Sequence, residues 1–286
     1  MSEQITVAEA VGRTLAAVGV AHSFGVVGSG NFHMTNALVN GGVEFTQTRN
    51  EMGAALAADA YSRLSGKVAV VSVHQGGGYL NSLTGVLEAV KAHTGMVVLA
   101  GDVERGDFVS NFAHDQDGVA EAVGAIAMRV RAAEQAIDDA AEAVHTAATK
   151  RLPVVLSVPI DVQEELVEWS PELVPPAPVV VPAGADAESI AGLVDLLASA
   201  ERPVIVGGRG AVHAKAELRA LGAASGALLI ASGGGRGVFE GDEWALDIMG
   251  GYATQGSAEL VQEADLLVVF GVALTKWTAR GGSLTE

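Results

Sequence analysis

The 286-residue sequence contains no cysteine, which excludes disulfide bonds, thiolate metal sites and a cysteine nucleophile. Aromatic residues are also scarce, at 5%, whereas glycine occupies 36 positions and apolar residues make up 49% of the chain. This composition favours a tightly packed α/β protein with many short turns between strands and helices. The length favours two domains over a single core.

Basic residues are only half as numerous as acidic ones. The 17 Lys and Arg residues against 34 Asp and Glu residues give a formal net charge of -17. Such a surface repels nucleic acid and anionic lipid, so we expect neither as a partner. The sequence has no apolar run of the roughly 20 residues that a membrane helix needs, and its start, MSEQITVAEAVGRTL, has no basic and apolar leader. We therefore expect a cytoplasmic protein.

Strand-like and helix-like patterns alternate through residues 1–165. The continuous β-branched run KVAVVSVH, residues 67–74, is typical of a strand that is buried on both faces. An Ala-rich helix is expected over residues 51–64, and Thr6 is a predicted N-cap of the first helix. Repetition of strand and helix predicts a doubly wound, mostly parallel sheet.

Residues 166–185 differ in composition, because five of the eight prolines lie there. This segment is predicted to be an extended linker. The alternation of strand and helix resumes in residues 186–286, which predicts a second α/β domain of Rossmann-like type. The sequence ends soon after the last clear helix of this domain, so we expect an incomplete, truncated sheet there.

The stretch TRNEMGAALAADAYSRLSGKVAVVSVH places one acid, Glu51, at the head of the small-residue helix. One interpretation is structural, because an acid in the first turn complements the helix dipole. The other is functional: Glu51 follows a predicted strand, and ligands bind at the carboxyl edge of open α/β sheets. A carboxylate in such an apolar slot could share a proton with a heterocycle nitrogen.

The loop HQGGGYLN, residues 74–81, contains three consecutive glycines. Their spacing matches neither the dinucleotide-binding fingerprint nor the Walker A pattern, so a phosphate cradle is not predicted. The glycines either satisfy positive φ angles in a turn or leave room for a flat ring.

These motifs together resemble a known family. In order and spacing, they are similar to thiamine-diphosphate-dependent enzymes of the acetolactate synthase, benzoylformate decarboxylase and benzaldehyde lyase group. The segments that carry the resemblance are FGVVGSGNFHMTNAL, the stretch from TRNEMG to the glycine loop, and RPVIVGGRGA with ADLLVVFGVALTKWTARGG. The resemblance covers nearly the whole chain. Residues 1–165 match the pyrimidine-binding domain, and residues 186–286 match the central domain.

The resemblance implies a role for Glu51 as the glutamate that hydrogen-bonds a ring nitrogen of the cofactor's aminopyrimidine and so promotes formation of the nucleophilic ylide. It also implies a set of residues near the pyrimidine: Gly28, Gln75, Gly77, Gly78 and Asn81. Acetolactate synthases usually have Ser and Pro where Gln75 and Gly77 stand, which leaves the substrate class open.

Three further residues are candidates for the substrate side of the site. His114 or Gln116 could replace the family's substrate-side glutamine, although both could equally belong to a solvated polar loop. His74 could act as an acid or base, or could serve only as a structural hydrogen-bonding group. The histidines do not have the spacing of zinc ligands, so no metal site is predicted in this sequence.

In this family a third domain holds the diphosphate and Mg²⁺ through a Gly-Asp-Gly stretch, and no such stretch occurs here. We therefore expect this chain alone to be inactive. It could be the subunit of a split enzyme whose partner carries the diphosphate-binding domain, a piece of a longer enzyme, or a non-catalytic protein that binds FAD or another nucleotide. FAD is suggested only by the glycine turns GGRGA and ASGGGRG.

The expected activity is that of a lyase, decarboxylase, carboligase or transferase. The expected substrate is a small molecule, either a 2-keto acid or a 2-hydroxyketone. The small-residue helix that Glu51 begins is predicted to pack against a second copy in a homodimer or larger oligomer.

Overall fold

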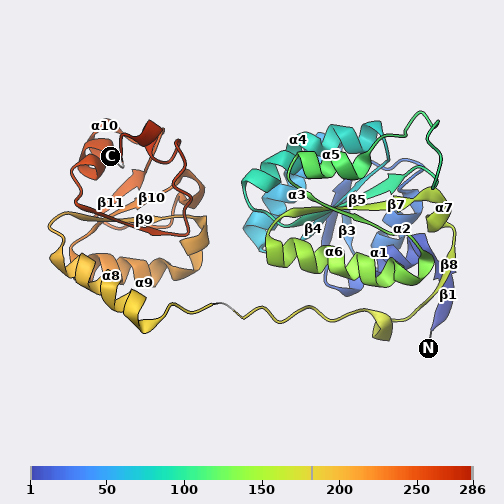
Figure 1. Ribbon diagram of the computed structural model, residues 1–286, viewed down its shortest axis with the longest axis horizontal. Coiled ribbons are helices and arrows are strands. Elements are labelled where there is room, and N and C mark those ends of the chain that lie inside the picture. The colour runs from blue at the N-terminus through green and yellow to red at the C-terminus, as the bar shows by residue number, and fades with distance from the viewer. Residues whose placement is uncertain (1, 182, 285–286) are drawn as a thin grey trace. The chain divides into compact units, whose positions relative to one another are not determined.

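A computed structural model describes residues 2–181 and 183–284. The chain divides into two compact units, Met1–Val181 and Pro182–Glu286. Each unit is an α/β structure with its own parallel sheet, as Figure 1 shows. The predicted fold class, two mostly parallel α/β domains, is confirmed.

The first unit is built on a six-stranded sheet with the strand order β3-β2-β4-β5-β7-β6, and every pairing in it is parallel. Its strands are β2 (His22–Gly25), β3 (Glu44–Gln47), β4 (Ala69–Val73), β5 (Met96–Asp102), β6 (Ile126–Arg129) and β7 (Pro153–Pro159). All residues of the central strands β4, β5 and β7 are buried, which is what a continuous β-branched run requires in a sheet covered on both faces.

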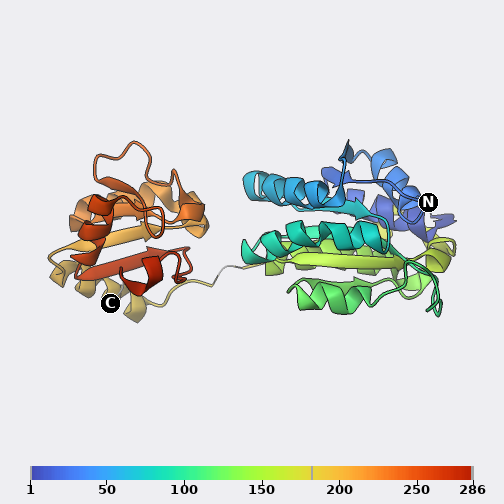
Figure 2. The same cartoon turned by 90° about the horizontal axis from the view of Figure 1, so that it is seen from above.

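Helices cover both faces of this sheet (Figures 1 and 2). One face packs against α1 (Val7–Ala17), α2 (Phe32–Asn40), α6 (Ala136–Lys150) and the short α7 (Ile160–Gln163). The opposite face packs against α3 (Glu51–Ser65), α4 (Gly77–Lys91) and α5 (Gln116–Ala122). A 3-10 turn, η1 (Ala133–Gln135), precedes α6. The Thr6 cap of α1 is confirmed, because its Oγ1 accepts a hydrogen bond from Glu9 N at 3.3 Å.

The segment that the prolines marked as a linker begins as part of the first unit. Residues 166–169 form β8 (Leu166–Trp169), which pairs antiparallel with β1 (Glu3–Thr6), and the 3-10 turn η2 (Pro171–Leu173) follows. Trp169 fastens this pair to α1, because its Nε1 donates to Thr14 Oγ1 at 3.0 Å and its ring lies 5.3 Å from the Arg13 guanidinium carbon. Because β1 and β8 are far apart in the sequence, no local pattern indicates that they pair. The prediction from composition therefore assigned residues 166–169 to the linker.

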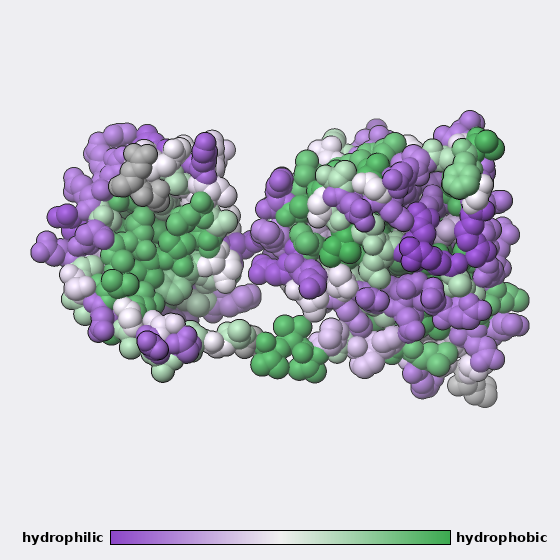
Figure 3. All heavy atoms as spheres, viewed as in Figure 1, coloured by the Kyte–Doolittle hydropathy of each residue, from purple (hydrophilic) through white to green (hydrophobic). Residues whose placement is uncertain are grey.

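The second unit has a four-stranded parallel sheet in the order β11-β10-β9-β12. Its strands are β9 (Pro203–Gly207), β10 (Leu228–Ala231), β11 (Ala245–Ile248) and β12 (Leu266–Phe270). Its helices are α8 (Ala187–Ser199), α9 (Lys215–Ser225) and α10 (Gln255–Gln262), with the 3-10 turns η3 (Arg209–Ala214), η4 (Gly233–Gly235) and η5 (Arg280–Gly282). Apolar residues gather over part of the face of this unit that Figure 3 shows.

No helix among residues 2–181 and 183–284 is both long enough and apolar enough to span a membrane.

Candidate active site

Three segments meet at the carboxyl edge of the first unit's sheet, where parallel α/β sheets bind ligands. The loop after β2 carries Gly28, α3 begins at Glu51 just after β3, and the loop after β4 carries His74 and the glycines. The structure brings together five of the predicted site residues, since close approaches link Gly28 with His74, Gly78 with both Glu51 and His74, and Asn81 with Glu51.

Glu51 is half-buried at the first position of α3. The helix is capped by the residue before it, because Asn50 Oδ1 accepts a hydrogen bond from Gly53 N at 3.1 Å. Glu51 is therefore not needed as the cap. Its Oε2 accepts a hydrogen bond from Asn81 Nδ2 at 3.2 Å, whereas Oε1 has no hydrogen-bond partner among the described residues. One carboxylate oxygen is held in place and the other is available to a ligand.

The three glycines of the loop after β4 serve different purposes. Gly76 has a φ of 67° and is the N-cap of α4, so the turn itself requires a glycine there. A Cβ atom at residue 78 would lie 3.3 Å from Glu51 Oε1, so this glycine allows α4 to approach the carboxylate. A Cβ atom at residue 77 would meet nothing within 4 Å. The space beside Gly77 is open, as a flat ring at this place would need.

The small residues of α3 pack inside the first unit. Ala54, Ala55 and Ala58 are fully buried, and a Cβ atom at Gly85 of α4 would lie 2.5 Å from Ala55 Cβ. These residues therefore bring α3 and α4 close together and hold Asn81 next to Glu51. The outward face of α3 carries larger apolar side chains, Met52 and Leu56, which are 39% and 38% exposed.

His74 forms a hydrogen-bonded pair with Ser29, a residue that the sequence analysis did not select. His74 Nδ1 lies 2.8 Å from the Gln75 carbonyl oxygen, which can only accept, so Nδ1 carries the proton. In the neutral imidazole, His74 Nε2 then accepts the hydrogen bond from Ser29 Oγ at 3.2 Å. A Cβ atom at Gly28 would lie 2.6 Å from His74 Cδ2, so the imidazole reaches this place only because residue 28 is glycine.

Gln75 differs from the other predicted residues because its side chain is turned inward. It is 2% exposed, and its Oε1 lies against Gly30 and Gly101, where added Cβ atoms would come within 1.7 Å and 2.8 Å. Gln75 contributes to the site only through its backbone, whose carbonyl oxygen accepts the hydrogen bond from His74 Nδ1. A cofactor contact by its side chain stays a prediction.

His114 and Gln116 lie beside a separate cavity of about 490 Å³ under the loop that joins β5 to α5. The His114 ring stacks on the Tyr79 ring at a centroid distance of 5.8 Å, and Tyr79 Oη donates to the Gln116 carbonyl oxygen at 3.2 Å. Burial, together with the nearby Asp117 carboxylate, raises the pKa of Tyr79 well above its usual value. Among the described residues no hydrogen bond connects either predicted residue with Glu51 or His74.

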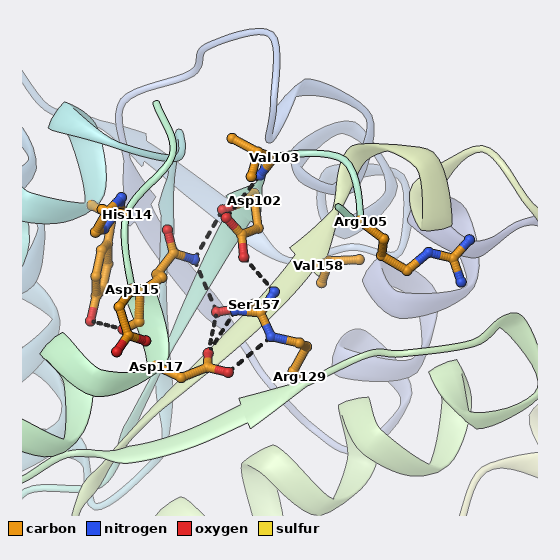
Figure 4. A network of polar contacts seen from close by, with 12 residues as sticks. Asp102, Val103, Arg105, His114, Asp115, Asp117, Arg129, Ser157 and Val158 are labelled. Atoms are coloured by element: carbon orange, nitrogen blue, oxygen red, sulfur yellow. Dashed lines mark hydrogen bonds and ion pairs between the residues drawn. The ribbon is translucent and has the colours of Figure 1, made fainter. Parts of the chain in front are cut away.

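A network of polar and charged side chains includes three residues that line this cavity, Asp102, Gln116 and Arg129 (Figure 4). The Arg129 guanidinium donates to both oxygens of Asp117 at 2.9 Å and also to Asp102 Oδ2. Ser157 Oγ accepts a hydrogen bond from Gln116 Nε2 at 2.9 Å. Bidentate pairing of this kind holds an arginine side chain in one orientation.

Neither a metal site nor an FAD site is apparent in the part of the chain that the structure describes. Residues 2–181 and 183–284 contain no group of three or more His, Asp or Glu side chains that could hold a metal ion. In the second unit the glycine turns pack against one another: a Cβ atom at Gly208 would lie 2.1 Å from the Gly271 carbonyl oxygen, and one at Gly235 would lie 2.6 Å from that of Gly207. The alternative of an FAD site has no support, because close backbone packing accounts for these glycines.

Family models identify both units. Residues 5–121 match the N-terminal cofactor-binding domain of thiamine pyrophosphate enzymes, and residues 190–285 match the central domain of the same enzymes. The first match contains Glu51 together with Ser29, His74 and Asn81.

Curated relatives agree with this assignment. A probable 2-ketoarginine decarboxylase of Pseudomonas aeruginosa is 28% identical over 278 residues, which cover 94% of this chain and 49% of the relative. The large subunit of acetolactate synthase isozyme 2 of Escherichia coli is 30% identical over 270 residues, 92% of this chain and 49% of the relative. A 2-hydroxyacyl-CoA lyase of Arabidopsis thaliana is 29% identical over 222 residues, which cover 72% of this chain and 38% of the relative.

The chain spans about half the length of the first two of these relatives. The regions that match are the N-terminal and central domains, in the same order as the two units of the structure. The chain belongs to the thiamine pyrophosphate enzyme family.

Proposed function

We propose that this chain supplies the aminopyrimidine side of a thiamine-diphosphate site in a lyase, decarboxylase or carboligase that acts on a 2-keto acid or a 2-hydroxyketone. The observation that carries the proposal is the pair of Glu51 and Asn81. One oxygen of Glu51 is fixed by Asn81 at 3.2 Å, and the other has no partner among the described residues.

The residues around Glu51 fit the cofactor. A protonated ring nitrogen would hydrogen-bond the available Oε1, and the open space beside Gly77 would accept the ring. When bound, thiamine diphosphate would supply a nucleophilic thiazolium carbon for addition to a carbonyl, and its thiazolium ring would serve as the electron sink when a carbon–carbon bond breaks. Glu51 holds the proton at the ring nitrogen, and Asn81 keeps the carboxylate in the orientation that this requires.

We propose that His74 moves a proton on the substrate side. Its Nδ1 is committed to the Gln75 carbonyl oxygen, so Nε2 is the atom that accepts or returns a proton, with Ser29 Oγ as its neighbour. The Phe112 ring, whose centroid lies 4.9 Å from that of His74, covers one side of the imidazole and limits its contact with water.

The names of the relatives support the substrate class. They are named as a probable 2-ketoarginine decarboxylase, an acetolactate synthase large subunit and a 2-hydroxyacyl-CoA lyase. We propose that the diphosphate and Mg²⁺ are held by a further domain, on a longer form of this chain or on a second subunit, because the sequence offers no matching ligands.

A homodimer through α3 and α4 is part of the proposal. Four apolar side chains on these helices are between 38% and 43% exposed: Met52, Leu56, Leu80 and Leu87. A surface of this kind near a ligand site is typical of a protein interface. Burial of this face would also exclude water from Glu51.

Calorimetry on the protein purified from its source, with every co-purifying subunit, tests the proposal. Thiamine diphosphate with Mg²⁺ should bind saturably, and an analogue with carbon in place of the ring nitrogen should bind at least about tenfold more weakly, as expected for loss of one charge-assisted hydrogen bond. Equal affinity for the two compounds, or no binding of either, would contradict the proposal and favour a non-catalytic protein.

A further inference from the structure

The segment that carries Ser29, residues 26–31 between β2 and α2, is a loop without regular structure. Glycines precede and follow Ser29, so its immediate neighbours leave its direction free. Its Oγ nevertheless lies 3.2 Å from His74 Nε2. Contacts from other residues therefore hold the hydroxyl in place.

Asn31, at the end of this loop, is fully buried, and its side chain closes the loop on itself. Its Oδ1 accepts a hydrogen bond from Gly28 N at 2.8 Å, and its Nδ2 donates to the Val26 carbonyl oxygen at 3.2 Å. A backbone N–H can only donate and a carbonyl oxygen can only accept, so the two ends of the amide are assigned. These two bonds fix the backbone on the N-terminal side of Ser29.

The same amide joins the loop to β4, the strand that ends next to His74. Asn31 Nδ2 also donates to Ser72 Oγ at 2.9 Å. Thr35 Oγ1 donates to the Asn31 carbonyl oxygen at 2.7 Å, so it accepts at its 2.7 Å contact with Ser72 Oγ. The single hydroxyl proton of Ser72 thus goes to Thr35, and Ser72 Oγ is left to accept from Asn31. The buried network is consistent with one orientation of the Asn31 amide.

A second buried amide holds the other side of Ser29. Gln163 of α7 is 5% exposed, and its Nε2 donates to the carbonyl oxygens of Gly30 and Val158, both at 2.9 Å. The backbone is therefore fixed on both sides of Ser29. Asn31 differs from Gln163 because it also binds the strand that leads to His74.

We propose that Asn31 is a positioning residue that sets Ser29 Oγ against His74 Nε2. Its amide fixes the loop backbone at two points and, through Ser72, fixes the loop to the strand two residues before His74. An ionised aspartate can only accept hydrogen bonds and an apolar residue makes none, so neither could replace the amide. The effect of Asn31 on the reaction rate rests on the proposed function, in which His74 moves a proton, whereas its effect on the geometry does not.

Hydrogen exchange in the full chain tests the role of Asn31 without any substitution. Gly28 N donates to Asn31, whereas Ser29 N donates no hydrogen bond to any of the described residues. The Gly28 amide should therefore exchange at least about tenfold more slowly than the Ser29 amide, after correction for their intrinsic rates. Equal protection of the two amides would overturn the proposal.

Nitrogen-15 NMR of the His74 imidazole provides the second test, because the Nε2 resonance reports the hydrogen bond that this atom accepts. Ser29→Ala and Asn31→Ala should shift the resonance in the same direction. The double variant should add little to either change, since both remove one bond.

Thr35→Val is the matched control. It also removes a buried hydroxyl, 3% exposed, but it keeps the three bonds of the Asn31 amide, so the resonance should stay in place. A folded Asn31→Ala protein with the wild-type resonance, or an equal shift in Thr35→Val, would overturn the proposal. If Asn31→Ala does not fold, the exchange measurement on the wild type decides alone.

Steady-state kinetics on the assembled holoenzyme separates this proposal from the proposed function. Asn31→Ala should lower kcat/KM by roughly three- to tenfold, about as much as Ser29→Ala, and the double variant should lose no more than either alone. A shifted resonance with unchanged kcat/KM would support the positioning of Ser29 and contradict the proposed role of His74. An unshifted resonance with reduced kcat/KM would overturn the positioning role of Asn31 and leave the role of His74 intact.

Discussion

Ser29 Oγ lies 3.2 Å from His74 Nε2, across two loops that are 45 residues apart in the sequence. The Gln75 carbonyl oxygen fixes the protonated nitrogen of His74, and the absence of a side chain at Gly28 lets the ring approach. The pair stands at the same sheet edge as Glu51, and we propose that it donates and accepts a proton on the substrate side.

The first prediction concerns this pair. In the assembled holoenzyme His74→Ala should lower kcat/KM by about 10²- to 10⁴-fold, the usual contribution of a positioned acid–base group. The control is His33→Ala, an exposed change on α2, which should have little effect. Steady-state kinetics on both variants checks this. Equal rates for the His74→Ala variant and the wild type would remove His74 from the chemistry.

A second prediction follows from the close packing of α3 and α4. Gly85→Ala would place a methyl group 2.5 Å from Ala55 Cβ and 2.8 Å from Leu56 N, so it should lower the free energy of unfolding by about 1–3 kcal/mol. Gly53→Ala is the matched control, because a Cβ atom there meets nothing within 4 Å. It should stabilise α3 by roughly 0.5–1 kcal/mol. Urea denaturation measures both, and a stable Gly85→Ala variant would contradict this packing.

The third prediction is a pH dependence of stability at Asp139 on α6. Burial, and then repulsion by Glu142 and Asp138, raises the pKa of Asp139 to about 6, and its Oδ2 has no partner. The native state therefore holds this proton between about pH 4 and pH 6 while the unfolded chain releases it. The contribution of Asp139 to stability is most favourable at low pH and is lost as the pH rises through 6.

Asp139→Asn should accordingly raise the free energy of unfolding at pH 8 by about 1 kcal/mol, a value reduced for the partial exposure of the side chain. At pH 4 the variant and the wild type should differ little. Denaturant titrations at the two pH values provide the measurement. A gain of equal size at both would show that ionisation of Asp139 is not the cause.

The oligomer interface gives the fourth prediction. Leu56→Glu places a charge on the exposed apolar face of α3 and should weaken self-association by at least about tenfold, because the charge would be desolvated in the interface. Leu173→Glu changes a side chain that is 49% exposed in η2 and serves as the control. Light scattering over a range of protein concentrations distinguishes them, and two identical curves would place the interface elsewhere.

Features that depend on neighbouring residues could be predicted from the sequence. Continuous β-branched runs indicated β4, the Ala-rich pattern indicated α3, and Thr6 was found as an N-cap. Glu51 could be selected because its strand, helix and glycine loop follow one another directly. The open space at Gly77 also agrees with the clearance that the glycines suggested.

Features that depend on distant contacts could not be predicted. The antiparallel pair of β1 and β8 joins the two ends of the first unit. The prolines of residues 166–185 led us to assign β8 to the linker instead. Ser29 had no signal beyond a polar residue between two glycines, and only folding brings it to His74. The inward direction of Gln75 depends on the absence of side chains at Gly30 and Gly101, which lie far from it in the sequence.

The central claim is that Glu51 holds the proton at the aminopyrimidine. The most direct measurement is exchange of the cofactor's thiazolium C2 proton with deuterium in the assembled holoenzyme, for the wild type and for Glu51→Gln. We predict that exchange slows by about 10²- to 10⁴-fold in the variant, as expected for loss of acid–base assistance. Cofactor affinity should change by less than about tenfold. Exchange at the wild-type rate in a variant saturated with cofactor would contradict the claim.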